Sequence, residues 1–548
     1  MENSSNNYMQ MLIEKWRVPE VWGDKPVQEP SLCVFNNTAY ALDLLHKHIV
    51  THGKIAAHSD VDVDGIGTGY ILNKFLKYYG VRGVINIINS EKVHGIKQKH
   101  ADYFNLNPID LIIITDSSCN ELEIIKQFTC DVLVVDHHDI LHNDTIGFCN
   151  DGVHRYVIVN STLKNNNYVS DNLWLEKFNK DDLKNLSQYT GTDEMSCGLL
   201  LYELLRVYNT AYDSGLVLKN LMLYQWAAVT LITDIITNTN SRNAYYLYEM
   251  TYSREIESTL RILLNLLDPS KHHIDKTFIN FKMAPVFNKT IRAGKASEAL
   301  SVALFSPSEI DSLSKYGPIQ EEMIDKALYY TTTDSMGLTT RAKRLFKQDV
   351  INLDIESLDI PRSYAGVIAS KILGEFGKTA FVYCKDTESN RLDGSCRGKS
   401  KEVNYRELCD NFSEDIYSQG HAQAFGFKMT KEQLGQISEL IAKSEPAEDT
   451  PLITLGENIP KGKYHIDNYE DFRKQGFIWK IGIGNSLVSS KDEIVIDIDT
   501  SLLKLKETKG KLFLYDLFGT SCKSFKAISG SRAKLYIEMS KELEFYIK

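Results

Sequence analysis

The chain has 548 residues, which is too long for a single hydrophobic core, so we expect two to four domains. Hydrophobic residues make up 43% of the chain and charged residues 24%, as in an ordinary soluble globular protein. The net charge of −10 argues against a protein that binds nucleic acid through positive charge alone.

The first predicted elements lie between about residues 50 and 165, where apolar runs alternate with helical patterns. Short continuous apolar runs occur at 55–57, 111–114, 132–135 and 157–159, and a further strand is predicted at 84–88. Such runs are typical of strands that are buried on both faces of a parallel sheet. The alternation of strands and helices therefore predicts an α/β fold with a doubly wound parallel sheet.

Side chains that can bind metal follow the first of these strands. His58, Asp60, Asp62 and Asp64 occupy alternate positions, and Gly65 can turn the backbone sharply after them. In an extended segment, alternate side chains lie on the same surface. So many like charges are unfavourable without a cation, which predicts a metal site. The competing interpretation is an acidic loop without a metal.

Two further predicted strands end in residues of the same kind, one before Asp116 and one before Asp136-His137-His138. Because ligands of open α/β sheets gather at the carboxyl ends of the strands, we expect these groups to meet at one edge. Mg²⁺ and Mn²⁺ prefer oxygen ligands, and an added imidazole favours Mn²⁺. The sequence therefore predicts a site for two divalent cations, with Mn²⁺ preferred or Mg²⁺.

The segment from about 190 to 345 is predicted to be mainly helical, with apolar helices at 195–207 and 221–236. The second helix contains Asp234, and a carboxylate inside an apolar helix is costly unless it is paired or bound to metal. We expect Asp234 to join the metal site. The alternatives are that Asp234 caps the helix end or pairs with a cation such as Arg242.

The next block returns to mixed α/β character, with a helix predicted at 364–376 and a strand at 380–384. Two polar, glycine-bearing stretches follow at 394–398 and 420–427. Glycines let backbone N–H groups approach phosphates closely, and Arg397 can make a bidentate contact to one. The competing interpretation is that both stretches are ordinary turns.

A polar segment bracketed by prolines, at 444–451, predicts a linker. Beyond it, two-residue alternation predicts short strands, which are at 477–481, 493–498, 511–515 and 534–537. Several short strands in about a hundred residues favour a small barrel or sandwich. An OB-like barrel would suit single-stranded nucleic acid, although its aromatic residues could equally fill the core.

The number and spacing of cysteines and the lengths of the apolar stretches indicate the cellular compartment. The nine cysteines form no Cys-x-x-Cys pair, and their odd number favours free thiols in a reducing cytoplasm. No apolar stretch approaches the ~20 residues that span a bilayer, and the N-terminus lacks the pattern of a secretory signal. We therefore expect a cytoplasmic protein that has no membrane partner.

The ordered set of motifs resembles the DHH phosphoesterase superfamily and, within it, the RecJ-type single-strand-specific exonucleases. The triplet that gives the superfamily its name is present as Asp136-His137-His138. The resemblance runs from about residue 53 to 430. Further segments that resemble family motifs are 60–65, 159–160, the surroundings of Asp234, 284–292, 366–371, 394–397 and 420–426.

The resemblance implies roles for individual residues. One metal would be held by His58 and Asp62 and the other by Asp64 and His137, with Asp116 as a bridge and Asp234 completing the cluster. His138 follows a ligand and is expected to point elsewhere, toward the scissile phosphate, while Asp136 would orient a ligand histidine. The implied catalytic residues are Asp62, Asp64, Asp116, His137, His138 and Asp234. The implied substrate contacts are His138, Asn288, Arg292, Ser395, Arg397, Gly420 and His421.

The chain departs from the family pattern in its substrate motifs and keeps every expected metal ligand. Gln419 replaces the first glycine of a Gly-Gly-His motif, and Gly398 follows Arg397 where serine is usual. These departures leave the length, the sugar and the polarity of the substrate open.

The resemblance implies a domain plan. It consists of an N-terminal extension at 1–50, a DHH catalytic domain with its helical part and connecting helix at 51–345, a substrate-binding α/β domain across a cleft at 346–443, and the small all-β, OB-like domain at 452–548.

The activity implied by the resemblance is that of a 5′ to 3′ exonuclease that degrades single-stranded DNA to mononucleotides in a bacterial or phage-infected cytoplasm. A helicase or a single-strand-binding protein is a further expected partner, and the oligomeric state stays open. One alternative is a phosphodiesterase of the same superfamily that acts on short oligonucleotides or cyclic dinucleotides. Another alternative is a nucleic-acid-binding protein without catalysis.

Overall fold

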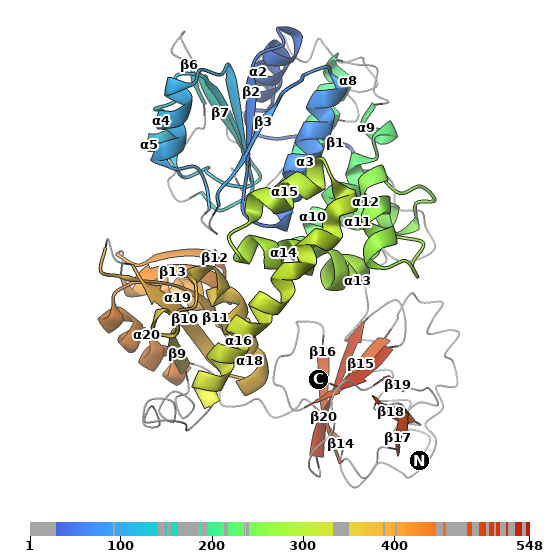
Figure 1. Ribbon diagram of the computed structural model, residues 1–548, viewed down its shortest axis with the longest axis vertical. Coiled ribbons are helices and arrows are strands. Elements are labelled where there is room, and N and C mark those ends of the chain that lie inside the picture. The colour runs from blue at the N-terminus through green and yellow to red at the C-terminus, as the bar shows by residue number, and fades with distance from the viewer. Residues whose placement is uncertain are drawn as a thin grey trace. The chain divides into compact units, whose positions relative to one another are not determined.

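The computed structural model divides the chain into two compact units, Pro26–Gln320 and a second that includes Glu321–Lys548 (Figure 1). The described residues are 29–90, 94–140, 148–150, 155–162, 186–188, 194–212, 217–234, 236, 241–332, 350–386, 389–400, 403–413 and 415–444, together with the strands named below for the C-terminal region. No helix within these ranges has the length and apolarity to span a bilayer.

The first unit contains a six-stranded sheet in the order β3-β2-β4-β5-β7-β6. Its strands are β2 (Ile55–Ser59), β3 (Ile85–Ile88), β4 (Leu111–Thr115), β5 (Asp131–Asp136), β6 (Phe148–Asn150) and β7 (Arg155–Asn160). All neighbouring strands run parallel except the edge strand β6, which pairs antiparallel with β7. The predicted parallel sheet is therefore confirmed.

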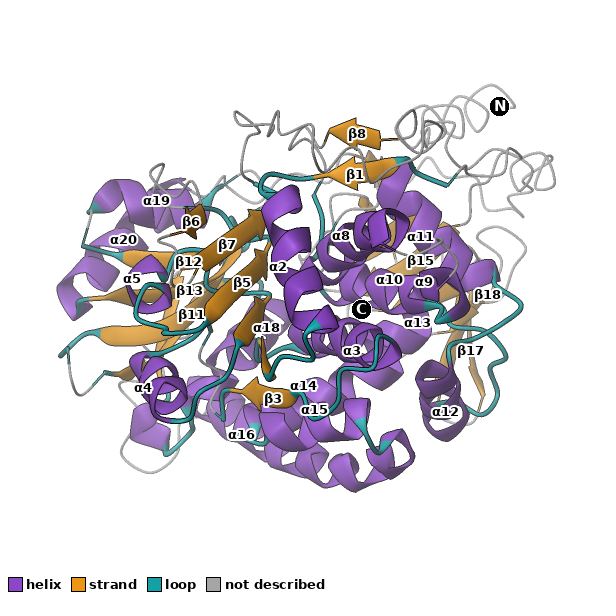
Figure 2. Ribbon diagram, turned by 90° about the horizontal axis from the view of Figure 1, so that it is seen from above, coloured by secondary structure: helices purple, strands orange, loops and turns teal. Residues whose placement is uncertain are grey.

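Helices cover both faces of this sheet because its strands are apolar on both faces. Ala57, Ile113 and Val135 face a core that includes α2 (Thr38–Val50), α3 (Val63–Tyr78) and α8 (Cys197–Tyr212). The alternate residues Ile112, Ile114 and Val134 face a second core with α4 (Gln98–Leu106) and α5 (Leu122–Ile125). Figure 2 shows the strands between these two sets of helices.

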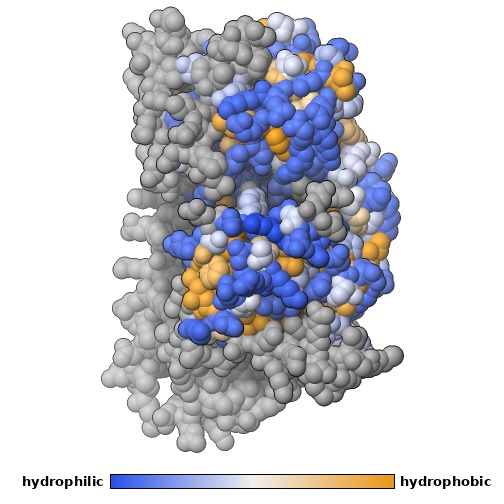
Figure 3. Space-filling model, turned by 90° about the vertical axis from the view of Figure 1, so that its left-hand side faces the viewer, coloured by the Kyte–Doolittle hydropathy of each residue, from blue (hydrophilic) through white to orange (hydrophobic). Residues whose placement is uncertain are grey.

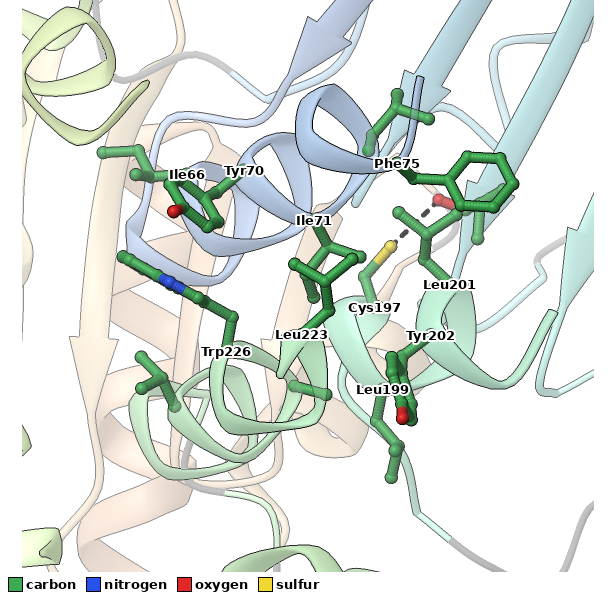
Figure 4. Close-up of a cluster of buried hydrophobic side chains, with 14 of the residues drawn as sticks. Ile66, Tyr70, Ile71, Phe75, Cys197, Leu199, Leu201, Tyr202, Leu223 and Trp226 are labelled. Atoms are coloured by element: carbon green, nitrogen blue, oxygen red, sulfur yellow. Dashed lines mark hydrogen bonds between the residues drawn. The ribbon is translucent and has the colours of Figure 1, made fainter. Parts of the chain in front are cut away.

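The helical part of the first unit packs against α3 and α8. Its elements are α9 (Val217–Asn220), α10 (Leu223–Thr233), α11 (Ser241–Tyr252), α12 (Ser258–Leu267), α13 (Lys276–Phe278), a π-helix (Ile279–Met283), α14 (Ala284–Arg292), α15 (Ala296–Leu304) and a 3₁₀ helix (Pro307–Lys315). α16 (Tyr316–Thr332) then leads into the second unit. In Figure 4, Tyr70 of α3 lies against Trp226 of α10, with ring centroids 4.5 Å apart. Both predicted apolar helices are confirmed with shifted bounds, as α8 and α10.

A short parallel pair, β1 (Leu32–Val34) and β8 (Leu186–Gln188), completes the first unit. The cysteines whose side chains the structure describes are free thiols, as predicted, and all but Cys384 are buried. On the face drawn in Figure 3, hydrophilic side chains predominate among the described residues, and apolar ones are scattered in small groups.

The second unit contains a mixed five-stranded sheet in the order β12-β13-β11-β10-β9. Its strands are β9 (Val350–Asp354), β10 (Thr379–Lys385), β11 (Leu392–Arg397), β12 (Tyr417–His421) and β13 (Ala424–Met429). α18 (Ala365–Phe376) packs on one face, and α19 (Tyr405–Phe412) and α20 (Lys431–Ser444) pack on the other. The helix and the strand predicted before the glycine-bearing stretches are both present.

The first glycine-bearing stretch lies in β11, so its interpretation as an ordinary turn is wrong, whereas the second spans the hairpin of β12 and β13 and includes the turn between them. Gly394 lies in the middle of β11, where an added Cβ would stand 2.4 Å from the carbonyl oxygen of Val382 and 2.6 Å from Cζ of Phe427. The glycine is therefore needed for close strand packing. Gly420 adopts φ +130° at the hairpin between β12 and β13, a conformation that other residues rarely take.

The C-terminal region forms strands where two-residue alternation predicted them. One sheet has the order β14-β16-β20-β15-β21 and the other β17-β18-β19. These strands are β14 (Ile453–Leu455), β15 (Trp479–Gly484), β16 (Glu493–Asp499), β17 (Lys504–Thr508), β18 (Lys511–Tyr515), β19 (Cys522–Lys523), β20 (Arg532–Met539) and β21 (Glu544–Ile547). The OB-like barrel stays a prediction, and all but the first residue of the predicted linker lies outside the described residues.

Candidate metal centre

Three parallel strands deliver acidic and imidazole groups to one edge of the first sheet. Ser59 of β2 stands beside Thr115 of β4, and Thr115 stands beside Val135 of β5. The residues that follow each strand therefore emerge at the same edge, as ligands of open α/β sheets do.

Three overlapping sets of side chains at this edge could hold a cation. Within each set, one ligand atom per residue lies within 4.8 Å of the others. The sets are Asp60, Asp62 and Asp116; Asp64, His137 and Asp234; and Asp116, His137 and His138. Since Asp116 and His137 each belong to two sets, the sets form one continuous centre. The structure thus brings together all the predicted metal ligands except His58.

His58 lies outside these three sets but is suited to a metal in another way. Its ring is fully buried, and neither ring nitrogen has a hydrogen-bond partner among the described residues. The nearest ring is that of His100, with centroids 5.3 Å apart. Burial lowers the pKa of His58 to about 4, which leaves the neutral imidazole that metals bind. An unpartnered buried nitrogen is costly, so a metal ligand role fits His58 and stays a prediction.

The segment from His58 to Asp64 is not one extended strand, so the expected strand alternation is wrong, although Asp60, Asp62 and Asp64 still meet at the centre. β2 ends at Ser59, and α3 begins at Val63. Asp62 caps that helix, because its Oδ1 accepts the N–H of Gly65 at 2.9 Å. The helix turns successive side chains in different directions, so the alternation of a strand no longer applies.

Asp60 and Asp64 consequently have different hydrogen-bond partners. Asp60 Oδ2 lies 2.5 Å from Nδ1 of His94, and its Oδ1 accepts the N–H of Gly95 at 3.2 Å. Asp64 accepts the backbone N–H groups of Cys197 and Gly198, at 3.0 and 3.1 Å, from the first turn of α8. Burial, followed by the charges of neighbouring aspartates, raises the pKa of Asp64 well above its usual range.

Asp116 has a strained backbone and an unfavourable charge environment. Its φ is +65°, a left-handed conformation that costs on the order of 1–3 kcal/mol for a residue other than glycine. Burial raises the pKa of Asp116 well above its usual range, and the charges of Asp64 and Asp62 add to the effect. The mutual repulsion at this position favours a bound cation as the compensating charge.

His137 and His138 both approach the centre, and the contact of His138 with the scissile phosphate stays a prediction. Their ring centroids are 4.7 Å apart, and both histidines form a set with Asp116. His137 Nε2 lies 3.2 Å from Asp116 Oδ1 and 3.6 Å from Asp234 Oδ2. The strand β5 ends at Asp136, so the two histidines are not held on opposite faces.

Asp136 orients His138, whereas the prediction was that it orients a ligand histidine such as His137. Its Oδ1 lies 2.7 Å from His138 Nδ1. Burial alone would lower the pKa of His138, but the charge and hydrogen bond of Asp136 outweigh burial and raise it to about 10. Asp136 therefore holds the pKa of His138 above the usual range of an imidazole and fixes its ring beside the acidic groups.

Asp234 lies at the end of α10 rather than inside the helix. It is the C-cap residue, and its backbone N–H donates to the carbonyl oxygen of Thr230 at 3.0 Å. Pairing with Arg242 is wrong, because Arg242 instead forms an ion pair with Glu203 at 2.9 Å. A carboxylate at the negative end of a helix dipole is unfavourable, which again favours a cation nearby.

The predicted substrate residues occupy both units. Asn288 and Arg292 lie on α14 of the first unit, where Arg292 Nη1 donates to Gln320 at 2.7 Å. In the second unit, Arg397 of β11 donates to Ser370 Oγ at 3.1 Å. The remaining predicted contacts on the strands of that unit are Ser395, Gly420 and His421. The predicted cleft and these substrate roles stay predictions.

Sequence reasoning missed two residues that support the centre, His94 and Cys197. His94 follows β3, a strand of the same parallel sheet, so its position beyond a strand end was a usable signal. Cys197 begins an apolar helix in a Ser-Cys-Gly segment, and such small polar residues often mark a helix start.

Comparisons with known proteins agree with this fold. The chain is 23% identical over 554 residues to a Bacillus subtilis (strain 168) protein named "Putative SPbeta prophage-derived single-strand DNA-specific exonuclease YorK", covering 92% of this chain and 86% of that protein. The crystal structure of RecJ from Thermus thermophilus in complex with Mn²⁺ matches with a TM-score of 0.61 at 15% identity, covering 95% of this chain and 74% of that one.

The chain resembles RecJ-type DHH proteins in sequence and in fold. A crystal structure of exonuclease RecJ bound to manganese matches with a TM-score of 0.50 at 17% identity, covering 76% of this chain and 97% of that one. The Thermus thermophilus RecJ in complex with Mg²⁺ matches with a TM-score of 0.52 at 15% identity, over 96% of this chain and 73% of that one. No protein-family model matches the chain. The resemblance that the motifs predicted is thus confirmed.

Proposed function

We propose that this protein is a divalent-metal-dependent exonuclease that hydrolyses single-stranded DNA from the 5′ end and releases mononucleotides. The observation that carries the proposal is the continuous centre of acidic and imidazole groups at the edge of a parallel sheet. The name of the Bacillus subtilis relative supports the substrate, and the manganese and magnesium in the RecJ structures support the cofactor.

Two cations would be held by residues that the motifs single out. His58 and Asp62 would hold one, Asp64 and His137 the other, with Asp116 between them. Asp234 would complete the ligand set, and the unpartnered nitrogens of buried His58 fit such a role. When bound, two such cations lower the pKa of a water molecule and stabilise the charge that develops on the phosphoryl group.

The side chains around the centre would bind and orient the substrate. His138 donates through Nδ1 to Asp136, which fixes its ring and leaves its other nitrogen to contact a phosphoryl oxygen. Arg292 and Arg397 would hold flanking phosphates through their planar groups of donors. Asn288, Ser395, Gly420 and His421 would contact the terminal nucleotide.

The proposal extends to partners and compartment. Single-stranded DNA is the proposed macromolecular partner, and a helicase or single-strand-binding protein that supplies the strand is a natural companion. The prophage origin of the relative supports a bacterial or phage-infected cytoplasm.

The first test compares substrates. We expect the full-length protein with Mn²⁺ to degrade a single-stranded 40-mer from its 5′ end and to spare a duplex, as read from 5′- and 3′-labelled DNA. RNA and a dinucleotide are included in the same assay. Activity on the dinucleotide alone, or activity only from the 3′ end, would overturn the proposal.

The second test is Asp116→Asn, since asparagine tolerates the left-handed backbone at this position. We expect cleavage to fall by at least about 100-fold, because the variant loses the carboxylate shared by two of the three sets. The unfolding temperature without metal should not fall, since a repelling charge is removed. Asp110→Asn, an exposed position before the other end of β4, is the control and should cleave like the wild type. Retained cleavage by Asp116→Asn would refute the assignment.

A further inference from the structure

Cys197 lies where the elements that carry the acidic groups meet. It is the first residue of α8, and its side chain is fully buried and belongs to none of the three metal-capable sets. The thiol donates to the carbonyl oxygen of Val135 at 3.1 Å and accepts the N–H of Asp116 at 3.1 Å. Figure 4 shows the first of these contacts as a dashed line from the sulfur.

The backbone of the same residue holds a second acidic group. The N–H of Cys197 donates to Asp64 Oδ2 at 3.0 Å, and the next N–H, that of Gly198, donates to Oδ1 at 3.1 Å. One residue therefore contacts Asp64, Asp116 and the residue of β5 that precedes Asp136. No other described residue is seen to hydrogen-bond to both Asp64 and Asp116.

The chemistry of the side chain matters because of the backbone at Asp116. That residue has φ +65° and shares its N–H between the carbonyl oxygen of Val135 and the sulfur of Cys197. A strained conformation persists only where its surroundings hold it. A thiol or a hydroxyl can donate and accept at one atom, whereas a methyl group can do neither.

We propose that Cys197 is a positioning residue that fixes Asp64 relative to Asp116 and thereby sets the affinity of the centre for divalent metal. This inference rests on the proposed function, since it assumes that the centre binds metal. Cys197 is fully buried and would not contact the substrate, so its effect would pass through the two aspartates.

The test is Mn²⁺ binding to the full-length protein, measured by calorimetry on Cys197→Ala, Cys197→Ser and a control. Outer groups that hold metal ligands typically contribute 10- to 100-fold in affinity, so we expect Cys197→Ala to weaken Mn²⁺ binding by at least about tenfold. Cys197→Ser should recover most of the loss, because its hydroxyl can make both contacts.

The matched control is Cys130→Ala. Cys130 is also buried but lies just before β5, at the opposite end of that strand from the centre. The Cys130→Ala substitution removes the same atoms from the same unit as Cys197→Ala does. We expect this control variant to bind Mn²⁺ like the wild type. Thermal unfolding in the presence of EDTA measures how much each alanine substitution lowers the unfolding temperature of the metal-free protein.

The outcomes separate the inference from the proposed function. Wild-type affinity in Cys197→Ala would overturn the inference while leaving the function intact. Equal weakening in both alanine variants would also overturn it, since the effect would then be general destabilisation. A wild-type protein that neither binds Mn²⁺ nor cleaves DNA would overturn the proposed function, and the inference with it.

Discussion

At the scale of single residues, one buried carboxylate shapes the Asp-His-His turn. Asp136 Oδ1 accepts the backbone N–H groups of His137 and His138 and the Nδ1–H of His138. Its Oδ2 accepts the N–H of Cys119, which follows the loop that carries Asp116. The carboxylate therefore ties together the two loops that supply Asp116, His137 and His138 to the centre.

Asp136→Asn should impair both stability and catalysis. An amide can accept at one atom only, so it would leave the N–H of Cys119 unpaired and would release His138 from its charged partner. We expect a loss of about 1–3 kcal/mol in the free energy of unfolding, from denaturant titration. We also expect kcat to fall by about 10- to 100-fold.

Asp131→Asn separates the two effects. Asp131 is buried at the other end of β5 and bonds Lys47 and His48 at 2.8 and 2.7 Å. This control should lose stability and keep its kcat. Equal kcat values for Asp136→Asn and the wild type would contradict the role given to Asp136.

At the scale of elements, three helices cross at Thr230 of α10. An added Cβ at Gly67 of α3 would stand 2.6 Å from Thr230 Cγ2, and one at Gly198 of α8 would stand 2.3 Å from Thr230 Oγ1. These close approaches need glycine. Asp64 lies one turn before Gly67, and Asp234 lies one turn after Thr230. The close crossing of α3 and α10 therefore also sets the position of Asp64 relative to Asp234.

Gly67→Ala should therefore act on stability and on the metal centre together. Overpacking at the crossing is expected to lower the free energy of unfolding by about 1–3 kcal/mol. The Mn²⁺ affinity should fall as α3 and α10 move apart. Adding Thr230→Ser removes the one atom within 3 Å of the new methyl group and should restore both quantities.

A matched glycine shows the effect of alanine without a clash. Gly435 of α20 is exposed, and an added Cβ there would meet nothing within 4 Å. Gly435→Ala should stabilise its unit by about 0.5–1 kcal/mol. A Gly67→Ala protein that unfolds like the wild type would rule out a tight crossing.

At the scale of the whole molecule, the metal-capable groups lie in one unit, whereas the predicted phosphate contacts are divided between the two units, with Arg292 in the first and Arg397 in the second. All three sets lie within Pro26–Gln320, whereas Arg397 lies in the unit that includes Glu321–Lys548. A chain of net charge −10 gains little from nonspecific attraction to DNA, so individual cations should matter.

Arg397→Ala should accordingly change substrate binding and leave metal binding alone. We expect a higher KM for single-stranded DNA and an unchanged Mn²⁺ affinity. The logarithm of the DNA affinity, plotted against the logarithm of the salt concentration, should have a slope that is smaller by about 0.7 per lost phosphate contact. Arg391→Ala is the control, since Arg391 bonds the carbonyl oxygen of Asp415 just outside β11. A weaker Mn²⁺ affinity in Arg397→Ala would contradict this division between the units.

The sequence by itself determined the parallel sheet and most of the centre. Strands such as β4 and β5 are continuous apolar runs, and a run of that kind is stable only when both its faces are covered. Once the strands are parallel, their carboxyl ends share one edge. Asp116 and His137 could therefore be assigned to one site, because Asp116 directly follows β4 and His137 directly follows β5.

Only the tertiary structure decided how those groups are held. The start of α3 at Val63 replaced the expected extended segment, although Asp60, Asp62 and Asp64 still meet at the centre, and the close packing of β11 placed a glycine-bearing stretch within a strand. The contact of Cys197 with Asp64 joins residues 133 positions apart. Sequence periodicity reports the burial of a local segment, whereas such contacts depend on which segments become neighbours when the whole chain packs.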